Sequence, residues 1–222
     1  MQQSYKKIST ERRKERSKYT KWYYDNLYWI EDFPGKQHYR NFNYNDPTHE
    51  KRYRYLGDIL TKNFKFKTAL DAGCGMGHMM RELLHRDKKV KGVEVSKDAI
   101  KHFLADLNKK GLIAKAGLEK LPYKDGEFDL VFCSDVMEHI PMFDVPASIQ
   151  ELARVTKNYL VLTINLDHPY EYHPTIYSRP KWLQLFSKNK SLQHLRRLER
   201  KIEKKTKKKY CEYDWFIFKK VL

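Results

Sequence analysis

A short stretch near position 70 constrains the fold of this chain more than any other. Residues 68–72 are mostly apolar and predict a buried strand, and Gly73, Gly75 and Gly77 follow at alternate positions. These glycines let the backbone turn sharply and approach a ligand without an intervening Cβ, and a helix beginning there directs free N–H groups at that ligand. Apolar pairs at 79–80 and 83–84 supply the inward stripe of such a helix. The sequence therefore predicts a strand, a ligand-binding turn and a helix packed on the sheet.

Details of the turn distinguish among the cofactors that glycine-rich loops bind. No Lys-Ser or Lys-Thr pair follows the glycines, which disfavours a phosphate-binding P-loop, and the spacing differs from the dinucleotide fingerprint. Asp71 lies two residues before the first glycine, where its carboxylate can face a cationic ligand. Glu94 lies near the end of the apolar run 90–95, where an acidic side chain can accept both hydroxyls of a ribose. A nucleoside that carries a cation suggests S-adenosylmethionine.

Five ordered motifs make the resemblance more specific. They resemble the successive motifs of class I S-adenosylmethionine-dependent methyltransferases, and they lie at residues 70–77, 92–96, 119–123, 128–139 and 151–155. The resemblance implies a Rossmann-like, doubly wound α/β fold with a mostly parallel, seven-stranded sheet. It also implies S-adenosyl-L-methionine as cofactor and S-adenosyl-L-homocysteine as product. The cofactor residues that we expect are Asp71, Gly73, Cys74, Gly75, Gly77, Glu94, Val95, Leu118, Glu119 and Ser134.

One position departs from the family pattern. Many relatives carry an Asp that bonds the adenine amino group where this chain has Gly117. The contact would then come from backbone groups around Leu118. A domain that has lost its ligand, or a catalytically silent partner of another methyltransferase, would require a damaged loop, and this loop is whole.

The N-terminal part of the chain predicts an arm and a lid. Residues 4–21 are basic and poorly periodic, which favours a frayed or disordered arm that could become helical on contact. Twelve aromatic residues lie between Tyr19 and Tyr55, and they could close over the site or cap the open face of the sheet. We therefore divide the chain into residues 1–47, the arm and lid, and residues 48–222, the cofactor-binding domain.

The remaining elements follow from periodicity and capping signals. The expected helices span residues 47–60, 97–110, 146–155, 180–186 and about 190–209, and the later strands span 112–116, 129–134, 159–165 and 214–219. The strand 129–134 is continuously apolar, as a central strand buried on both faces should be. The basic helix would be an insertion before the last strand, whose hairpin partner is not recognisable in the sequence.

Polar residues follow the central strands at the edge where doubly wound sheets bind ligands. The catalytic candidates are Asp135, His139, His168 and His173. If the acceptor is a hydroxyl, a histidine with a pKa near neutrality is suited to take its proton. Residues Asp135, Glu138 and His139 also resemble the metal-binding motif of small-RNA 2'-O-methyltransferases and ubiquinone-pathway O-methyltransferases, although the first residue of that motif is Glu. The expected site nevertheless contains no metal.

The distribution of charged residues along the sequence suggests which kind of methyl acceptor the protein uses. The net charge is +17, and residues 181–222 hold 14 Lys and Arg against 4 Asp and Glu. We expect O-methylation of a small, anionic metabolite that bears a phosphate or a sugar, with RNA as the alternative acceptor. The other interpretation of this basic segment is a helix that is exposed to solvent and binds no anionic partner. No run is apolar enough for a membrane span or a signal peptide, so we expect a cytoplasmic protein with reduced cysteines.

Overall fold

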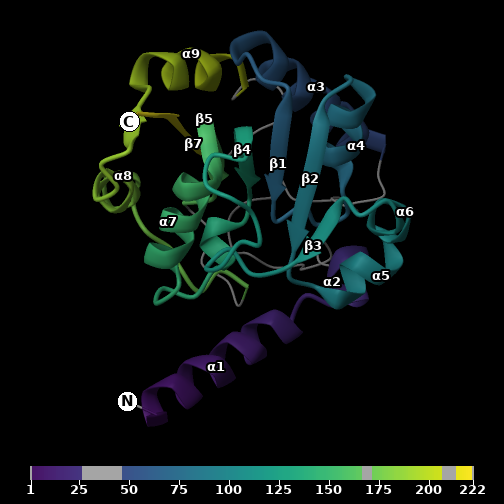
Figure 1. Cartoon of the computed structure of the whole chain (residues 1–222), viewed down its shortest axis with the longest axis vertical. Coiled ribbons are helices and arrows are strands. Elements are labelled where there is room, and N and C mark those ends of the chain that lie inside the picture. The colour runs from purple at the N-terminus through teal and green to yellow at the C-terminus, as the bar shows by residue number, and fades with distance from the viewer. Residues whose placement is uncertain (1, 27–46, 167–171, 207–213, 222) are drawn as a thin grey trace, which may run out of the picture.

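A sheet of seven described strands forms the centre of the molecule (Figure 1). The computed structural model describes residues 2–26, 47–166, 172–206 and 214–221. The strands are β1 (Thr68–Ala72), β2 (Lys89–Glu94), β3 (Ile113–Lys115), β4 (Phe128–Ser134), β5 (Thr156–Ile164), β6 (Leu192–His194) and β7 (Asp214–Lys220), in the order β3-β2-β1-β4-β5-β7-β6. Strand β7 is antiparallel to β5 and β6, and the other pairs are parallel. The predicted doubly wound, mostly parallel sheet is confirmed.

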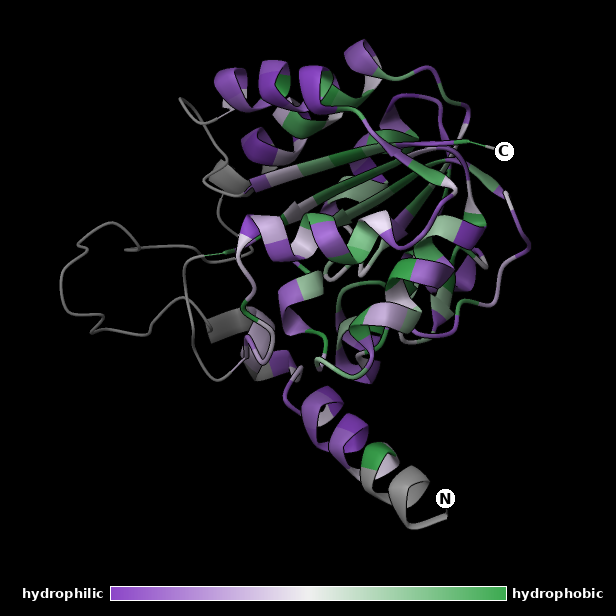
Figure 2. Cartoon of the chain, turned by 90° about the vertical axis from the view of Figure 1, so that its left-hand side faces the viewer, coloured by the Kyte–Doolittle hydropathy of each residue, from purple (hydrophilic) through white to green (hydrophobic). Residues whose placement is uncertain are grey.

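Helices cover both faces of this sheet. The described helices are α1 (Gln2–Ser17), α2 (Lys21–Asn26), α3 (Pro47–Asn63), α4 (His78–His85), α5 (Lys97–His102), α6 (Ala105–Lys109), α7 (Val145–Val155), α8 (Arg179–Ser187) and α9 (Arg196–Thr206). One face packs against α3, α4 and α9, and the other packs against α7 and α8. Figure 2 shows hydrophobic strands between helices with hydrophilic outer sides. None of the described helices is long and apolar enough to cross a membrane.

The strand order places the functional edge of the sheet. From β1 the chain proceeds through β2 to β3 on one side, and it then crosses to β4 and β5 on the other side. The order of strands therefore reverses between β1 and β4. Ligands bind at the carboxyl ends of the strands at such a reversal, because the two following loops diverge there. In this chain those loops begin at Gly73 and Asp135.

The N-terminal arm is the first difference from the sequence prediction. Residues 2–17 form helix α1 rather than a disordered arm. Two long-range ion pairs hold this helix: Arg12 pairs with Asp144 at the start of α7, and Arg16 pairs with Glu119 after β3. The sequence did not predict this helix because its apolar residues lack helical periodicity. Charged side chains make the ion pairs that hold it to the domain. Residues 27–46 of the predicted lid lie outside the described residues.

Two further elements differ from their predictions. The single helix expected over 97–110 is divided into α5 and α6, because Leu104 has φ of −113° and ψ of 10° between them. The start of the predicted basic helix is instead β6, the hairpin partner of β7 that could not be recognised. Strand β6 has only three residues, and the helical stripe of Leu195, Leu198 and Ile202 directly after it extended the predicted helix over them.

Arg179 connects the C-terminal elements. Its guanidinium donates to Asp214 at 2.7 Å and to the carbonyl of Trp215 at 2.9 Å, and it also pairs with Glu199. Glu199 is only 2% exposed, and it accepts a further hydrogen bond from the backbone N–H of Ile217 at 3.0 Å. This network attaches α9 to β7 and to the beginning of α8.

We expect Arg179→Met to lower the free energy of unfolding by about 3 kcal/mol, because it removes the guanidinium that pairs with buried Glu199 and with the half-buried Glu203 and Asp214. Denaturant titration of the intact protein measures this loss. Lys62→Met removes a solvent-exposed ion pair with Asp58 and should cost less than about 1 kcal/mol. Equal losses in the two variants would contradict the proposed importance of the Arg179 network.

Candidate cofactor and acceptor site

The glycine-rich loop has the backbone shape that the sequence predicts. Gly73 and Gly75 have φ of 80° and 52°, in the left-handed region that favours glycine. A Cβ at Gly73 would overlap the Val136 side chain, whereas a Cβ at Gly75 would find only the Tyr24 ring, at 3.8 Å. Gly73 therefore permits close packing between the two loops, and Gly75 is half-buried beside the Tyr24 ring.

Glu94 fixes the end of β2 against this loop. Its Oε2 accepts from the N–H of Gly75 at 2.9 Å, and its Oε1 accepts from the N–H groups of Val95 and Ser96, both at 2.8 Å. The hydroxyl of Tyr24 lies 3.5 Å from Oε1. Burial raises the pKa of Glu94, although the backbone hydrogen bonds oppose this effect. In this arrangement Tyr24 occupies a position where a hydroxyl of a ligand could approach the carboxylate.

Asp71 lies behind the loop rather than in the pocket wall. It is 5% exposed, and it accepts a hydrogen bond from the backbone of Met80 in the first turn of α4. Burial, together with the nearby charge of Glu94, raises its pKa to about 7. Asp71 therefore joins β1 to α4 and can affect a ligand through its field.

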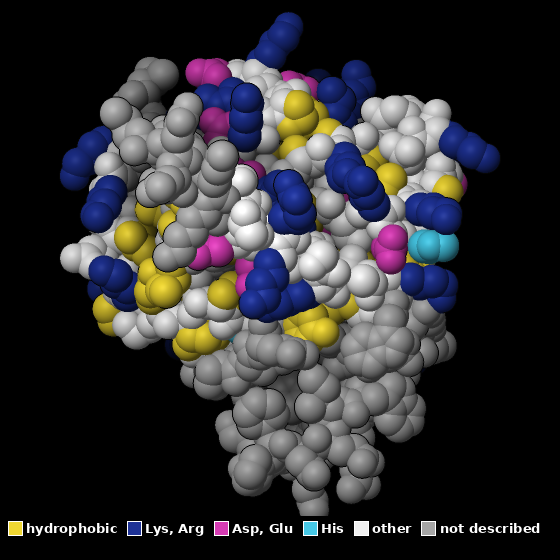
Figure 3. Space-filling view, turned by 90° about the horizontal axis from the view of Figure 1, so that it is seen from below, with side chains coloured by type: hydrophobic (Ala, Val, Ile, Leu, Met, Phe, Trp, Pro, Cys, Tyr) yellow, Lys and Arg dark blue, Asp and Glu magenta, His cyan; other side chains and the backbone are white. Residues whose placement is uncertain are grey.

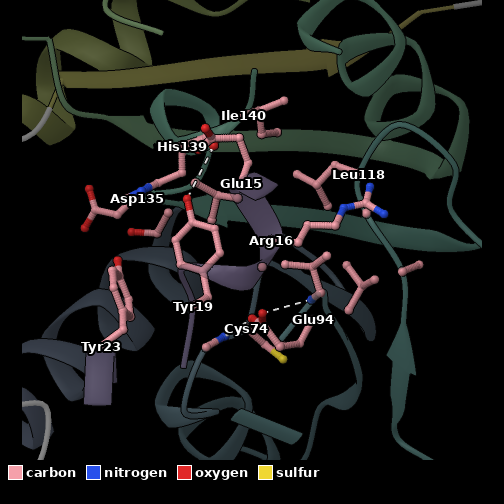
Figure 4. Close-up of a pocket in the computed structure, with 18 of the residues that line it drawn as sticks. Glu15, Arg16, Tyr19, Tyr23, Cys74, Glu94, Leu118, Asp135, His139 and Ile140 are labelled. Carbon is pink, nitrogen blue, oxygen red and sulfur yellow. Dashed lines mark hydrogen bonds between the residues drawn. The ribbon is translucent and has the colours of Figure 1, made fainter. Parts of the chain in front are cut away.

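A pocket extends from this loop across the carboxyl ends of β1, β2 and β4. Of the predicted cofactor residues, the ones that line it are Gly73, Cys74, Gly75, Glu94, Val95, Leu118, Glu119 and Ser134. The two that do not are Asp71 and Gly77, because Asp71 is buried behind the loop and Gly77 packs against Leu104. Figure 4 shows Glu94 and Cys74 on one side of the pocket and Asp135 and His139 on the other.

Helix α1 forms the wall of the pocket near β3. The guanidinium of Arg16 pairs with Glu119, and a Cβ at Gly117 would collide with both groups. The missing side chain at position 117 therefore makes room for this ion pair. Leu118 is buried beside it and lines the pocket. Sequence reasoning did not include Arg16, because residues about 100 positions apart leave no local signal of their pairing.

The other end of the pocket is formed after β4. Asp135 has φ of 55° and accepts a hydrogen bond from Arg52 of α3 at 3.0 Å. The Arg52 side chain is 7% exposed, so an arginine that the sequence prediction did not include lies almost fully buried at this edge. The hydroxyls of Ser134 and Thr163 are hydrogen-bonded at 2.7 Å. These contacts fix the side chains at the ends of β4 and β5.

The rim histidines differ in their placement. His139 lines the pocket, and its Nδ1 lies 2.8 Å from the carbonyl oxygen of Tyr172. His173 contacts the His139 ring with centroids 4.6 Å apart, but it does not line the pocket. His168 lies outside the described residues. Burial, together with His173, lowers the pKa of His139 to about 3, so this histidine does not have the near-neutral pKa that the sequence hypothesis assigned to a base.

The possible metal ligands also differ from the predicted set. Glu138, His139 and His173 have ligand atoms within 4.8 Å of one another, and Asp135 is not part of this group. Asp135 is instead paired with Arg52. Glu138 is fully buried, accepts from the N–H of Asn165 at 2.9 Å, and has its pKa raised by burial and by Asp135.

Aromatic side chains of the N-terminal arm cover the pocket. Tyr19 and Tyr23 pack edge to face with centroids 5.0 Å apart, and the Tyr19 hydroxyl donates to the carbonyl of His139 at 3.4 Å. The carbonyl of Tyr19 accepts from the Ser96 hydroxyl at 2.5 Å. Tyr19 therefore connects the two sides of the pocket (Figure 4). Within residues 19–24, the side chains of Tyr19, Tyr23 and Tyr24 line the pocket.

Comparisons with known proteins bear on the domain and its fold. Residues 70–162 match a family model described as a methyltransferase domain. A ubiquinone biosynthesis O-methyltransferase from Nitrosomonas europaea is 30% identical over 123 residues, which cover 50% of this chain and 49% of that protein. A solved structure from Pyrococcus horikoshii superposes with a TM-score of 0.63 at 17% identity, covering 84% of this chain and 99% of the other. Magnesium protoporphyrin IX methyltransferase from Synechocystis, solved with bound SAM, has a TM-score of 0.61 at 14% identity, covering 93% and 97%.

These findings identify the domain. Residues 70–162 form a methyltransferase domain, and the chain has the fold of class I S-adenosylmethionine-dependent methyltransferases, whose cofactor is S-adenosyl-L-methionine. The chain spans about half the length of the curated relatives that it matches.

The residues around the loop fit this cofactor. Asp71 and Glu94 are both buried, and neither forms an ion pair with a basic side chain in the described part of the chain. Their raised pKa values reflect the cost of burying charge without a cation nearby. The sulfonium and ammonium groups of the cofactor would favour the charged form of both carboxylates, and Glu94 can accept from ribose hydroxyls once Tyr24 moves away.

We expect the affinity for S-adenosyl-L-methionine to rise as the pH increases toward about 7 and then to level off. A cationic ligand favours ionised Asp71, so binding below its pKa of about 7 releases a proton. Calorimetric titration between pH 5.5 and 8 measures this slope, which is at most about tenfold per pH unit for one proton.

Asp71→Asn is the matched control, because it keeps an acceptor for the Met80 backbone but cannot ionise. Its affinity should depend less on pH than that of the unaltered protein. S-adenosyl-L-homocysteine, which lacks the sulfonium charge, should also show a shallower dependence. The same pH slope in Asp71→Asn would exclude Asp71 as its source.

Proposed function

We propose that this protein transfers the methyl group of S-adenosyl-L-methionine to a hydroxyl of a small, anionic acceptor that bears a phosphate or a sugar. The observation that carries this proposal is that Glu94 and Asp135 line the same pocket. Arg52 and His139 also line it, and Tyr19, Tyr23 and Tyr24 of the N-terminal arm contribute to its wall. The cofactor would occupy the Glu94 end. The acceptor would occupy the end next to Asp135.

The bound cofactor supplies an activated methyl group on a sulfonium, so the protein's contribution is mainly alignment and exclusion of water. The loop at Gly75 and the wall at Leu118 would hold the nucleoside part. The rings of Tyr19 and Tyr23 would separate the reacting groups from solvent. We infer that residues 1–47 act as this cover and residues 48–222 as the methyltransferase domain.

The cover favours a small acceptor. Tyr19 lies against both Tyr23 and His139, with a centroid distance of 5.8 Å to the imidazole. The arm is attached at both ends of the pocket by the ion pairs of Arg12 and Arg16. An acceptor enclosed under this cover must fit between the arm and the ends of the strands.

The charges in the wall favour an anion. Arg12, Arg16 and Arg52 all contribute to the lining, and they pair with Asp144, Glu119 and Asp135, respectively. A guanidinium has five N–H donors, so a paired arginine can still donate to a phosphate or carboxylate of the acceptor. Arg52 donates a hydrogen bond to Asp135, one of the predicted catalytic residues.

His139 would orient the acceptor hydroxyl. The carbonyl of Tyr172 can only accept a hydrogen bond, so the proton of the neutral imidazole lies on Nδ1. Its Nε2 is then an acceptor, which can receive a hydrogen bond from the hydroxyl that attacks the methyl group. As the O–C bond forms, the C–S bond would break, S-adenosyl-L-homocysteine would leave, and the proton of the methylated oxygen would pass to Nε2 and then to solvent. Because its pKa is lowered to about 3, His139 stays neutral at physiological pH. The similarity to an O-methyltransferase of ubiquinone biosynthesis supports oxygen as the acceptor atom.

The test is transfer of a radiolabelled methyl group from S-adenosyl-L-methionine to a panel of hydroxylated compounds, each supplied with and without a phosphate or carboxylate. We expect the anionic members to be methylated preferentially. Arg52→Gln should raise KM for an anionic acceptor about tenfold or more while cofactor affinity stays within about twofold, because it removes a charge-assisted hydrogen bond.

Lys62→Gln, on the same helix but outside the pocket lining, should leave both quantities unchanged. Preferential methylation of neutral compounds, or an unchanged KM in Arg52→Gln, would contradict the anionic acceptor.

A further inference from the structure

Helix α9 separates its acidic side chains from its basic ones. Glu199 is buried and Glu203 is half-buried, and both are paired with Arg179 at 3.0 Å or less. Glu199 also accepts from His194 at 2.7 Å. The two acids of the helix therefore neutralise charges inside the domain and contribute none to its outer side.

The outer side of α9 carries only cations. Its exposed basic residues are Arg196, Arg197, Arg200, Lys201, Lys204 and Lys205. Within the described part of the chain, no ion pair joins any of these side chains to an acid. They occur at positions i, i+1, i+4, i+5, i+8 and i+9, so they form two rows in which successive charges lie about 6 Å apart along the helix axis. We call this set the α9 basic face.

Neighbouring elements extend the α9 basic face. The hydroxyl of Tyr55 on α3 donates to the carbonyl of Lys205 at 3.0 Å, so α3 lies beside the end of α9. Lys51 lies one turn before Tyr55 on the same side of α3 and is exposed.

The opposite end of the molecule has a different charge pattern. Figure 3 views the described surface from below, where acidic side chains lie among the basic ones. Helix α9 lies at the top in Figure 1, away from α1. What distinguishes α9 is that its two acids face inward, so its six exposed cations lie together without an acid among them.

We propose that the α9 basic face binds the phosphodiester backbone of a nucleic acid. Rows of closely spaced cations match a polymer that carries one charge on every repeat, and each contact releases a counterion. Residues 196–206 include no aromatic side chain that could stack on a base. Binding should therefore depend on phosphates and salt and only weakly on base sequence.

An anionic membrane surface is the other partner of suitable charge, and the packing of α9 argues against it. An interfacial helix inserts its apolar side chains between lipids. The apolar residues Leu195, Leu198 and Ile202 instead pack into the core against the sheet. The helix could reach a membrane only through its charges, whereas a nucleic acid requires no insertion.

The experiment measures fluorescence anisotropy of a labelled, mixed-sequence, single-stranded RNA of about 20 nucleotides with the intact protein over a range of KCl concentrations. Replacing Arg196, Arg197, Arg200, Lys204 and Lys205 with Gln should weaken binding at least about tenfold at low salt. The slope of log K against log salt should become shallower by about 0.7 for each phosphate that the variant no longer neutralises. DNA of the same length should behave similarly, because the backbone charge is shared.

Two control variants keep the result interpretable. Replacing Lys101, Lys109, Lys110, Lys120 and Lys188 with Gln removes five exposed charges elsewhere and should change affinity by less than about threefold. Replacing the three arginines of α9 with Lys keeps the charge and should retain most of the affinity, with thermal unfolding confirming that each variant is folded.

The proposal is overturned if the two charge-removing variants weaken binding equally, or if the α9 variant binds RNA and DNA as the unaltered protein does. It is also overturned if vesicles containing phosphatidylserine bind more tightly than the nucleic acids and lose binding in the same α9 variant. Methyl transfer to a small acceptor is a separate measurement, so a failure of this proposal leaves the proposed reaction standing.

Discussion

The carboxylate of Glu94 is the constraint on which the site depends. It ends β2, accepts three backbone N–H groups at 2.8–2.9 Å, and thereby fixes the loop after β1 against the turn after β2. Burying this charge next to Asp71 is unfavourable in the absence of a cation, as the raised pKa values of both groups show. A cofactor that brings positive charge and hydroxyl donors relieves that cost, so the free energy stored by burial favours ligand binding.

Charge pairs also determine how the rest of the chain is arranged around the site. Arg12 and Arg16 attach the arm to Asp144 and Glu119, and Arg52 holds Asp135 at the edge of the sheet. These pairs place guanidinium groups in the pocket wall. The same principle operates at the C-terminus, where Arg179 draws the acids of α9 inward and leaves its outer side purely cationic. The basic residues of the chain thus form two different surfaces: the arginines of the pocket wall, which are paired with acids, and the outer side of α9, which carries only cations.

The sequence predicted those elements whose conformation depends on neighbouring residues in the chain. The glycine loop, Glu94 and the strands around them follow from turn chemistry and apolar runs, and the structure places most of the predicted cofactor residues in one pocket. The arm and the arginines could not be predicted in this way, because Arg12 contacts Asp144 across 132 positions without any periodic pattern. Strand β6 was missed because the helical apolar stripe of Leu195, Leu198 and Ile202 directly follows it, and the predicted helix was extended over it. The lowered pKa of His139 depends on burial by distant residues, which sequence spacing does not reveal.

The most direct test of this account is the affinity of S-adenosyl-L-methionine for the Glu94→Gln variant, measured by titration calorimetry. This variant keeps the side-chain volume but removes the charge, so we expect binding to weaken by about 1–3 kcal/mol, or roughly 5- to 150-fold. Glu127→Gln, which alters a surface ion pair with Lys91, should bind the cofactor normally. Unchanged affinity in a folded Glu94→Gln protein would show that the cofactor binds elsewhere.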